Sequence, residues 1–189
     1  MTRIIGGTAG SLKLQSPAKS TRPTSDRVRE AIFNRLQARD VLTDSHVLDL
    51  YAGTGALALE ALSHGAKSVV MVEANGKAAA VCVANSKLVQ KALEKADTWG
   101  DAKTVAKSVS SFLATETNKF DLVFIDPPYE ISNQEVTDNL AALNGKLNPK
   151  AQIVLERSSR TGLPELPSGM TLDESKNYGD TDIHWISIS

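Results

Sequence analysis

From residue 46 onward, short apolar runs alternate along the chain with longer segments whose apolar residues recur at helical spacing. The sequence predicts strands near residues 46–51, 68–73, 103–107, 120–126 and 151–156, separated by helices near residues 55–64, 76–95, 109–116 and 133–145. Apolar strands that alternate with helices are typical of a parallel sheet that is buried on both faces. The pattern therefore predicts a doubly wound α/β fold.

Both ends of the chain depart from this alternation. Two β-like stretches near residues 170–172 and 183–188 lie close together in the sequence, so we expect them to pair antiparallel at an edge of the sheet. Short β-like runs at the N-terminus predict a hairpin, and a helix capped by Thr24 or Ser25 follows. We therefore predict an N-terminal hairpin and helix extension over residues 1–40 and a catalytic domain over residues 41–189.

The charge of the chain is distributed unevenly between these two parts. The whole sequence has a net charge of −1, but residues 1–40 hold eight Lys and Arg against three Asp and Glu, a net charge of +5. A basic arm on an acidic body is typical of a protein whose one end meets a polyanion such as a nucleic acid. The residues predicted to bind RNA are Arg3, Lys13, Arg22, Arg27 and Arg29.

A glycine-containing loop follows the first predicted strand of the core. Residues 49–55 read Asp-Leu-Tyr-Ala-Gly-Thr-Gly and lead directly into a predicted helix. Glycines at such a junction let the backbone approach a ligand closely. Glu73 ends the next strand, twenty residues beyond Gly53, where an acid that binds ribose hydroxyls is expected. The loop lacks the third glycine of the dinucleotide fingerprint.

The negative charge of Asp49 distinguishes between possible nucleotide ligands. A carboxylate beside this loop is unfavourable close to a pyrophosphate, whereas it favours a nucleoside that carries a cationic group. S-adenosylmethionine has an adenosine for Glu73 and an ammonium and a sulfonium for Asp49. The predicted cofactor-binding residues of these two segments are Asp49, Tyr51, Ala52, Gly53, Thr54, Gly55, Glu73 and Ala74.

The predicted strand at residues 120–126 ends at Asp126-Pro127-Pro128-Tyr129. Tandem prolines lack N–H donors and have a restricted φ, so they end the strand and fix the directions of the neighbouring carbonyls. A carboxylate, a fixed carbonyl and an aromatic ring at one point can hold a planar amino group for attack on a methyl donor. We predict that Asp126, Pro127, Pro128 and Tyr129 form the catalytic site, the alternative being a strand-ending turn with a surface Asp and Tyr.

Other features of the sequence argue against several kinds of protein. Cys82 is the single cysteine, and the three histidines are scattered without ligand spacing, so we expect neither a disulfide nor a metal site. No apolar run approaches the roughly 18 residues of a membrane span, and no signal peptide is evident. We expect a cytoplasmic protein without membrane contact and without an obligate protein partner.

Three blocks together resemble the RsmD family of bacterial 16S ribosomal RNA (guanine-N2)-methyltransferases. They are residues 22–34 (RPTSDRVREAIFN), residues 47–57 (VLDLYAGTGAL) and residues 126–129 (DPPY). The resemblance implies a seven-stranded, Rossmann-like methyltransferase fold with an N-terminal hairpin extension. It also implies S-adenosylmethionine as the methyl donor, no metal, and 16S ribosomal RNA in an assembled small-subunit particle as the substrate.

The resemblance also implies roles for individual residues. The methionine half of the cofactor would lie against Asp49, Ala52, Gly53 and Gly55, with the ribose at Glu73, while Asp126, Pro127 and Tyr129 would address the guanine. The sequence departs from the family at two places. Ser108 stands where relatives often carry an acid that meets the adenine amino group, and residues 8–11 read Thr-Ala-Gly-Ser where relatives often place arginines.

Three other kinds of function remain open at this stage. DNA methyltransferases acting on adenine N6 or cytosine N4 can use the same four-residue motif, although they usually need additional sequence to recognise their target. A protein-glutamine methyltransferase typically has Asn at the position of Asp126. A non-catalytic RNA-binding ribosome assembly factor with a nucleoside pocket is the third alternative, and the presence of Asp49, Glu73 and Asp126 argues against it.

Overall fold

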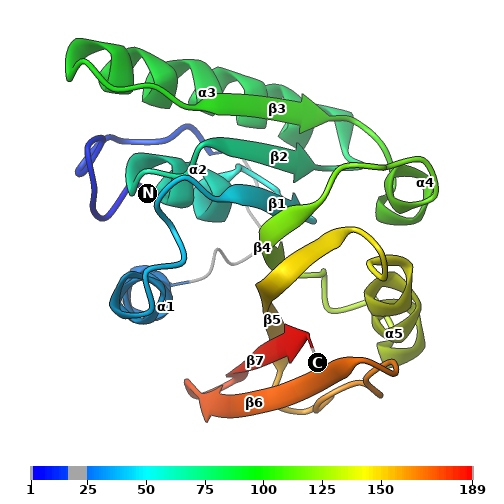
Figure 1. Cartoon of the computed structure of the whole chain (residues 1–189). Helices are drawn as coiled ribbons and strands as arrows, with labels where there is room; N and C mark the ends of the chain where they lie inside the picture. Colours follow the sequence, from blue (N-terminus) through cyan, green and yellow to red (C-terminus); the bar gives the residue numbers. More distant parts are fainter. Residues whose placement is uncertain (1, 17–24, 189) are drawn as a thin grey trace.

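Seven strands form one sheet in the order β3-β2-β1-β4-β5-β7-β6 (Figure 1). The computed structural model describes residues 2–16 and 25–188. The strands are β1 (His46–Leu50), β2 (Ser68–Val72), β3 (Asp101–Val105), β4 (Phe120–Ile125), β5 (Leu147–Ser158), β6 (Met170–Asn177) and β7 (Thr181–Ile188). The first five strands pair in parallel, and β7 is antiparallel to both β5 and β6. The predicted α/β fold and the antiparallel closing strands are confirmed.

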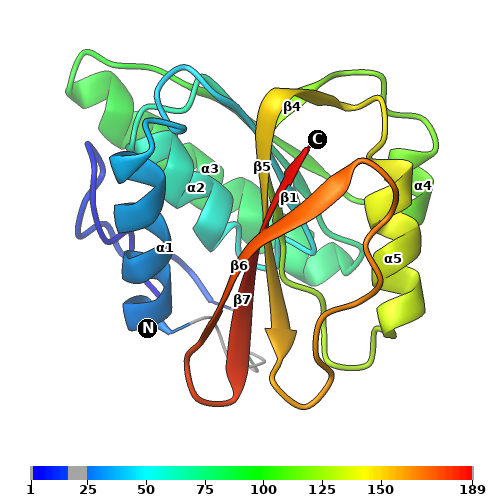
Figure 2. The ribbon, with the colours of Figure 1, turned by 60° about the horizontal axis from the view of Figure 1, so that its bottom comes forward.

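Five helices cover the two faces of the sheet (Figure 2). One face carries α1 (Asp26–Ala38), α2 (Ala56–Ser63) and α3 (Gly76–Lys95), and the other carries α4 (Val109–Leu113) and α5 (Asn133–Ala142). Side chains alternate between the two faces along each strand, so that Val47 joins the first apolar layer and Leu48 the second. This double burial explains why most residues of the central strands β1 and β4 are apolar, with Asp49 of β1 and Asp121 of β4 as the charged exceptions.

The strand bounds differ from the prediction at both ends of the parallel part of the sheet and at β6, which extends from Met170 to Asn177 and so is longer than the predicted stretch near residues 170–172. The outer strand β3 begins at Asp101, earlier than predicted. Its side chains are exposed or half-buried, so the polar residues at its start give no apolar pattern from which a strand could be predicted. β5 begins at Leu147, earlier than predicted, and its pairing with β4 shifts register between Phe120 and Leu122. This irregularity lies beside Pro149, which cannot donate a ladder hydrogen bond.

The N-terminal extension is a turn closed by backbone hydrogen bonds rather than a pair of full strands. Arg3 and Lys13 form an isolated antiparallel bridge, and the Ser11 amide donates to the Ile4 carbonyl at 2.8 Å. Ile4 and Leu14 are buried in the apolar layer that contains α1, α2 and α3. A boundary at residue 40 stays a prediction. Over the described residues, no helix is both long and apolar enough to cross a membrane.

Candidate active site

The predicted site residues follow three neighbouring strands at the same edge of the sheet. Leu50, near the end of β1, pairs with Val72 of β2 and with Ile125 of β4. The glycine loop, Glu73 and Asp126 come directly after these three strands. Because the carboxyl ends of parallel strands share one edge, the topology brings together segments that lie up to about seventy residues apart in the sequence.

The loop after β1 has a left-handed backbone at three of its five residues. The φ angles are 65° at Tyr51, 57° at Gly53 and 79° at Gly55. A Cβ atom on Gly55 would lie 2.8 Å from both the Cys82 and the Met71 sulfur atoms, whereas one on Gly53 would meet nothing within 4 Å. Gly55 is therefore required for packing beneath the loop, while Gly53 leaves its outer side open to a ligand.

Asp49 is a buried carboxylate with incomplete hydrogen bonding. The residue is 1% exposed, and its Oδ2 atom accepts a hydrogen bond from the Ala58 amide of α2 at 3.2 Å. Its Oδ1 atom has no hydrogen-bond partner within the described part of the chain. Burial raises the pKa of Asp49 to about 8, the Ala58 amide opposes this shift, and the negative charges of Asp126 and Glu73 add to it.

Glu73 holds the glycine loop from the end of β2. Its Oε2 atom accepts from the Gly53 amide at 2.9 Å, and its Oε1 atom accepts from the Asn75 amide at 2.7 Å. Asn75 in turn caps α3, accepting from the Lys77 and Ala78 amides. One carboxylate therefore fixes both the loop after β1 and the turn that carries the exposed Ala74. Each carboxylate oxygen retains a second lone pair for a ligand.

The side chain of Tyr51 lies apart from the other loop residues. Tyr51 packs against the second apolar layer, and its hydroxyl oxygen accepts from the Asn139 amide group of α5 at 2.7 Å. Burial raises the pKa of Tyr51 to about 12, and the nearby Glu135 carboxylate adds to the shift. Tyr51 was expected among the cofactor-binding residues, but its side chain reaches α5 and only its backbone belongs to the loop.

The segment after β4 carries one exposed ring on a fixed turn. Pro127 is buried, Tyr129 is 63% exposed, and the Ile131 amide donates to the Pro128 carbonyl at 3.0 Å. The far end of this turn is held by Arg157 of β5, whose Nη2 atom donates to the Ile131 carbonyl at 3.0 Å and to Asn133 Oδ1 at 2.8 Å.

Sequence reasoning did not identify Arg157. The residue is buried, and burial lowers the pKa of its guanidinium group. The one signal in the sequence is a charged residue at the end of an apolar run of β5, which reads Ile-Val-Leu-Glu-Arg. Such a residue usually has specific partners, but the sequence does not indicate which ones.

Ser108 follows β3 and is the N-cap of α4. Its hydroxyl oxygen accepts from the Ser111 amide at 3.2 Å and lies 2.8 Å from the Ser111 hydroxyl. The Ser108 side chain is exposed. Because β3 runs parallel to β2, Ser108 and Glu73 both follow the carboxyl ends of their strands, on the same side of the sheet. Capping therefore uses part of the hydrogen-bonding capacity that was expected to meet an adenine amino group.

The basic residues of the extension have different surroundings. Arg3, Lys13 and Arg27 are exposed, and Arg3 lies 3.7 Å from an Asp26 carboxylate oxygen. Arg22 lies outside the described residues. Arg29 is 1% exposed, which corrects the expectation that it is available to RNA.

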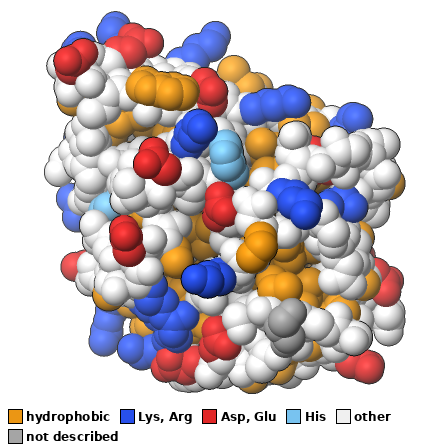
Figure 3. All heavy atoms as spheres, viewed as in Figure 1, with side chains coloured by type: hydrophobic (Ala, Val, Ile, Leu, Met, Phe, Trp, Pro, Cys, Tyr) orange, Lys and Arg blue, Asp and Glu red, His pale blue; other side chains and the backbone are white. Residues whose placement is uncertain are grey.

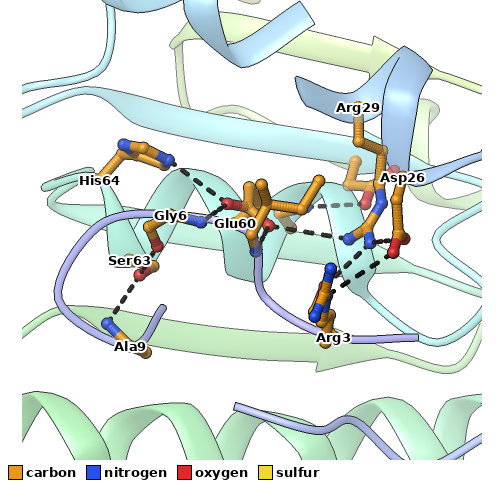
Figure 4. A network of polar contacts seen from close by, with 11 residues as sticks. Arg3, Gly6, Ala9, Asp26, Arg29, Glu60, Ser63 and His64 are labelled. Carbon is orange, nitrogen blue, oxygen red and sulfur yellow. Dashed lines mark hydrogen bonds and ion pairs between the residues drawn. The ribbon is translucent and has the colours of Figure 1, made fainter. Parts of the chain in front are cut away.

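Arg29 forms part of a buried polar network (Figure 4). Its Nη2 atom donates to the Arg3 carbonyl at 2.8 Å and to Asp26 at 2.7 Å, and its Nη1 atom lies 3.7 Å from Glu60 Oε2. The fully buried Glu60 of α2 also accepts from the Ile5 and Gly6 amides, each at 2.7 Å. These contacts hold the extension against α2, so Arg29 has a structural role.

Two further arginines, Arg35 of α1 and Arg39 at the C-cap of this helix, also have partners. Arg35 forms an ion pair with Glu174 of β6, and its guanidinium group lies 4.3 Å from the centre of the Trp185 ring. Arg39 donates to Gln152 Oε1 at 2.8 Å. In Figure 3, basic side chains over α1 have acidic side chains beside them. The net charge of residues 1–40 therefore overstates the positive surface that this part of the chain offers.

The described residues contain no group of three or more His, Cys, Asp or Glu that could hold a metal ion. The residues present do fit a cationic nucleoside. Asp49 provides a buried oxygen without a hydrogen-bond partner, Gly53 leaves open space beside it, and two further carboxylates contribute negative charge. The arrangement therefore suits a positive group beside a loop whose backbone is held by hydrogen bonds.

Comparisons with known proteins agree on one family. The model of the family described as Conserved hypothetical protein 95 matches residues 2–187. Ribosomal RNA small subunit methyltransferase D of Escherichia coli K12 is 36% identical over 178 residues, which cover 94% of this chain and 85% of that protein. The solved structure of the Escherichia coli protein yhhF has a TM-score of 0.82 and 32% identity, and the match covers 99% of this chain and 97% of that chain. A hypothetical protein of Thermus thermophilus has a TM-score of 0.81, 30% identity and 98% coverage of both chains.

Proposed function

Because the chain belongs to the RsmD family of methyltransferases, we propose that it transfers a methyl group from S-adenosylmethionine to the exocyclic N2 amino group of a guanine in 16S ribosomal RNA. Relatives named ribosomal RNA small subunit methyltransferase D support ribosomal RNA as the substrate. The observation that carries the proposal is the group of three carboxylates, Asp49, Glu73 and Asp126, at the carboxyl edge of the sheet, where one carboxylate oxygen is buried without a partner.

The cofactor would be held by residues of three strand ends. Asp49 would accept a hydrogen bond from the ammonium group, the open side of Gly53 would face the methionine chain, and Glu73 would accept from the ribose hydroxyls. The Ser108 hydroxyl would meet the adenine. When bound, S-adenosylmethionine supplies an electrophilic methyl group on its sulfonium.

The guanine amino group would be held by the turn after β4. Its lone pair is delocalised into the ring, so the isolated group is a poor nucleophile. The Asp126 carboxylate and the Pro127 carbonyl would each accept one N–H bond, which favours a pyramidal nitrogen and stabilises the positive charge that develops on it. The exposed ring of Tyr129 would stack on the base. A base must leave its stack to reach such a turn.

Recognition of the RNA would involve the exposed basic residues Arg3, Lys13 and Arg27 of the extension. Arg22 is proposed from the sequence alone. We take the assembled small-subunit particle as the substrate, because the family resemblance favours it, and a ribosomal substrate implies that the enzyme acts in the cytoplasm. The proposal includes no metal ion and no obligate protein partner.

Identification of the labelled product tests this proposal. The protein is incubated with radiolabelled S-adenosylmethionine and, in turn, small-subunit particles, free 16S RNA, duplex DNA and a protein extract, and the labelled material is digested. We expect label in N2-methylguanosine from the particles. Label in N6-methyladenine, N4-methylcytosine or protein would assign a different substrate, and the absence of label with normal cofactor binding would favour a non-catalytic assembly factor.

A further inference from the structure

Asn85 connects three segments that are distant in the sequence. It lies within α3 and is fully buried. Its Oδ1 atom accepts from the Gln15 amide at 2.8 Å, and its Nδ2 atom donates to the Gln15 carbonyl at 3.1 Å and to the Thr54 carbonyl at 3.0 Å. Thr54 belongs to the glycine loop and Gln15 to the N-terminal extension, so one carboxamide joins the two.

Helix formation does not explain why an asparagine lies at position 85 of α3. Asn is a poor helix former in the interior of a helix, where its side chain competes for backbone hydrogen bonds. Cys82, one turn earlier on α3, lies beneath Gly55 and makes an apolar contact that supports the loop. Asn85 adds a directional contact, because a donor at 3.0 Å fixes the position of the Thr54 carbonyl.

The extension is held near the same loop at a second point. Gly55 is the N-cap of α2, and the Glu60 and Ser63 side chains of this helix accept from the Ile5, Gly6 and Ala9 amides. These three hydrogen bonds do not involve Gln15, which comes after the turn of the extension. Gln15 is held by Asn85 instead. The position of Gln15 therefore depends directly on the carboxamide that also holds the loop.

We propose that Asn85 is a positioning residue that couples the cofactor loop to the N-terminal extension. Fixing Thr54 by a bound cofactor fixes the Asn85 carboxamide, which strengthens the attachment of Gln15. By thermodynamic reciprocity, attachment of Gln15 strengthens cofactor binding. This inference rests on the proposed cofactor site and adds a link between that site and the part of the chain proposed to contact RNA.

Amide hydrogen exchange of the full-length protein tests the coupling without any substitution. S-adenosylhomocysteine, the product, is added at saturation, and exchange is followed at the Gln15 amide. We expect exchange at Gln15 to slow by roughly threefold or more, since local opening there must break the contact with Asn85. An unchanged exchange rate at Gln15, with the ligand bound, would overturn the coupling.

Substitutions then test the role of the carboxamide. In Asn85→Ala, we expect S-adenosylhomocysteine binding to weaken roughly fivefold, the size of one lost hydrogen bond to a backbone carbonyl, and Gln15 exchange to become insensitive to the ligand. Asn85→Asp keeps the acceptor for the Gln15 amide but places a carboxylate against two carbonyls, so we expect weaker binding than in Asn85→Ala. Ser86→Ala is the matched control, because the buried Ser86 hydroxyl donates only within α3, to the Cys82 carbonyl.

The outcomes separate this inference from the proposed function. If the unsubstituted protein does not bind S-adenosylhomocysteine in calorimetry, the proposed cofactor site fails and the coupling fails with it. If the ligand binds but the Asn85 variants bind it as tightly as Ser86→Ala does, only the coupling is overturned. A larger effect in Asn85→Asp than in Asn85→Ala, together with a normal response in Ser86→Ala, would support it.

Discussion

Glu60 and Asp49 are both buried carboxylates, but their surroundings are opposite. Glu60 accepts from two backbone amides at 2.7 Å and has Arg29 and His64 beside it. Asp49 accepts one hydrogen bond at 3.2 Å, and its other oxygen has no hydrogen-bond partner among the described residues. The negative charges of Asp126 and Glu73 lie nearby. A buried carboxylate that is fully satisfied stabilises the fold, whereas one that is not satisfied is available to a cationic ligand.

The largest effect is expected at Asp126, whose negative charge lies near Asp49. In Asp126→Ala, turnover should fall roughly 10³-fold, because the charge that develops on the amino nitrogen loses its nearest carboxylate. Binding of S-adenosylhomocysteine should stay within about twofold, as the cofactor contacts lie on other strand ends. Methyl transfer to small-subunit particles and calorimetry measure the two quantities. The exposed Glu130 provides the control variant Glu130→Ala. Equal loss of turnover and of binding would contradict the role given to Asp126.

Loss of the satisfied carboxylate should affect stability rather than binding. Glu60→Gln removes the negative charge beside the buried Arg29 and leaves the exposed Asp26 as the remaining acidic partner of that cation. Breaking such a buried pair should lower the free energy of unfolding by about 3 kcal/mol. Urea denaturation measures the change, and Glu94→Gln on the exposed face of α3 is the matched control. A stability equal to that of the control would show that the network around Glu60 is dispensable.

Loss of the Asp49 carboxylate should instead weaken ligand binding without lowering the stability of the fold. Asp49→Asn should weaken S-adenosylhomocysteine binding roughly tenfold to a hundredfold, the range for a lost hydrogen bond to a charged group. The folded-state pKa of about 8 lies above the ordinary value of 3.8, so the stability of the native protein falls as the pH rises through this interval. The variant lacks this loss and should be more stable than the parent by several kcal/mol at pH 9, with a much smaller difference at pH 5.

Thermal unfolding at the two pH values measures this difference. A variant that is less stable than the parent at both pH values would place Asp49 with Glu60, as a structural carboxylate. A variant that is more stable at pH 9 and binds the ligand poorly would show that Asp49 serves ligand binding, whereas Glu60 serves the stability of the fold.

A smaller effect is expected at Arg157, which holds the turn after β4. Arg157→Lys keeps the charge but loses the paired contacts to the Ile131 carbonyl and Asn133 Oδ1. Turnover should fall roughly tenfold through misplacement of the turn, without a change in S-adenosylhomocysteine binding. Steady-state kinetics with particles shows whether the loss is in kcat. Arg160→Lys, in the exposed turn after β5, is the control. An unchanged kcat would show that Arg157 does not position the turn after β4 for catalysis.

The α/β fold and the antiparallel pairing of the closing strands could be predicted from the sequence. The apolar strands around Leu48 and Phe124 are buried on both faces, which is a strong local signal, and the segments after them necessarily meet at one edge. The strand bounds were less accurate at β3, because an edge strand with exposed side chains gives a weak apolar pattern. The family and the fold were therefore recognisable before any contact was known.

The partners of buried polar residues could not be predicted. Arg29 was grouped with the exposed basic residues, because the helix on which it lies does not indicate that Glu60, thirty-one positions later, packs against it. Asn85 and Arg157 were missed for the same reason, since each contacts backbone groups of distant segments. The contact of the Tyr51 hydroxyl with Asn139 of α5 was not predicted either, because the two residues lie far apart in the sequence.

Proton release on cofactor binding tests most directly whether Asp49 is a site for a cation. Calorimetric titrations of S-adenosylhomocysteine at pH 7 are repeated in buffers of different ionisation enthalpy. With a pKa of about 8, Asp49 is mostly protonated at pH 7, so the account predicts release of close to one proton per bound ligand, with affinity rising from pH 6 to pH 8. Asp49→Asn should release none. Ligand binding without proton release, and with the same affinity from pH 6 to pH 9, would contradict the account.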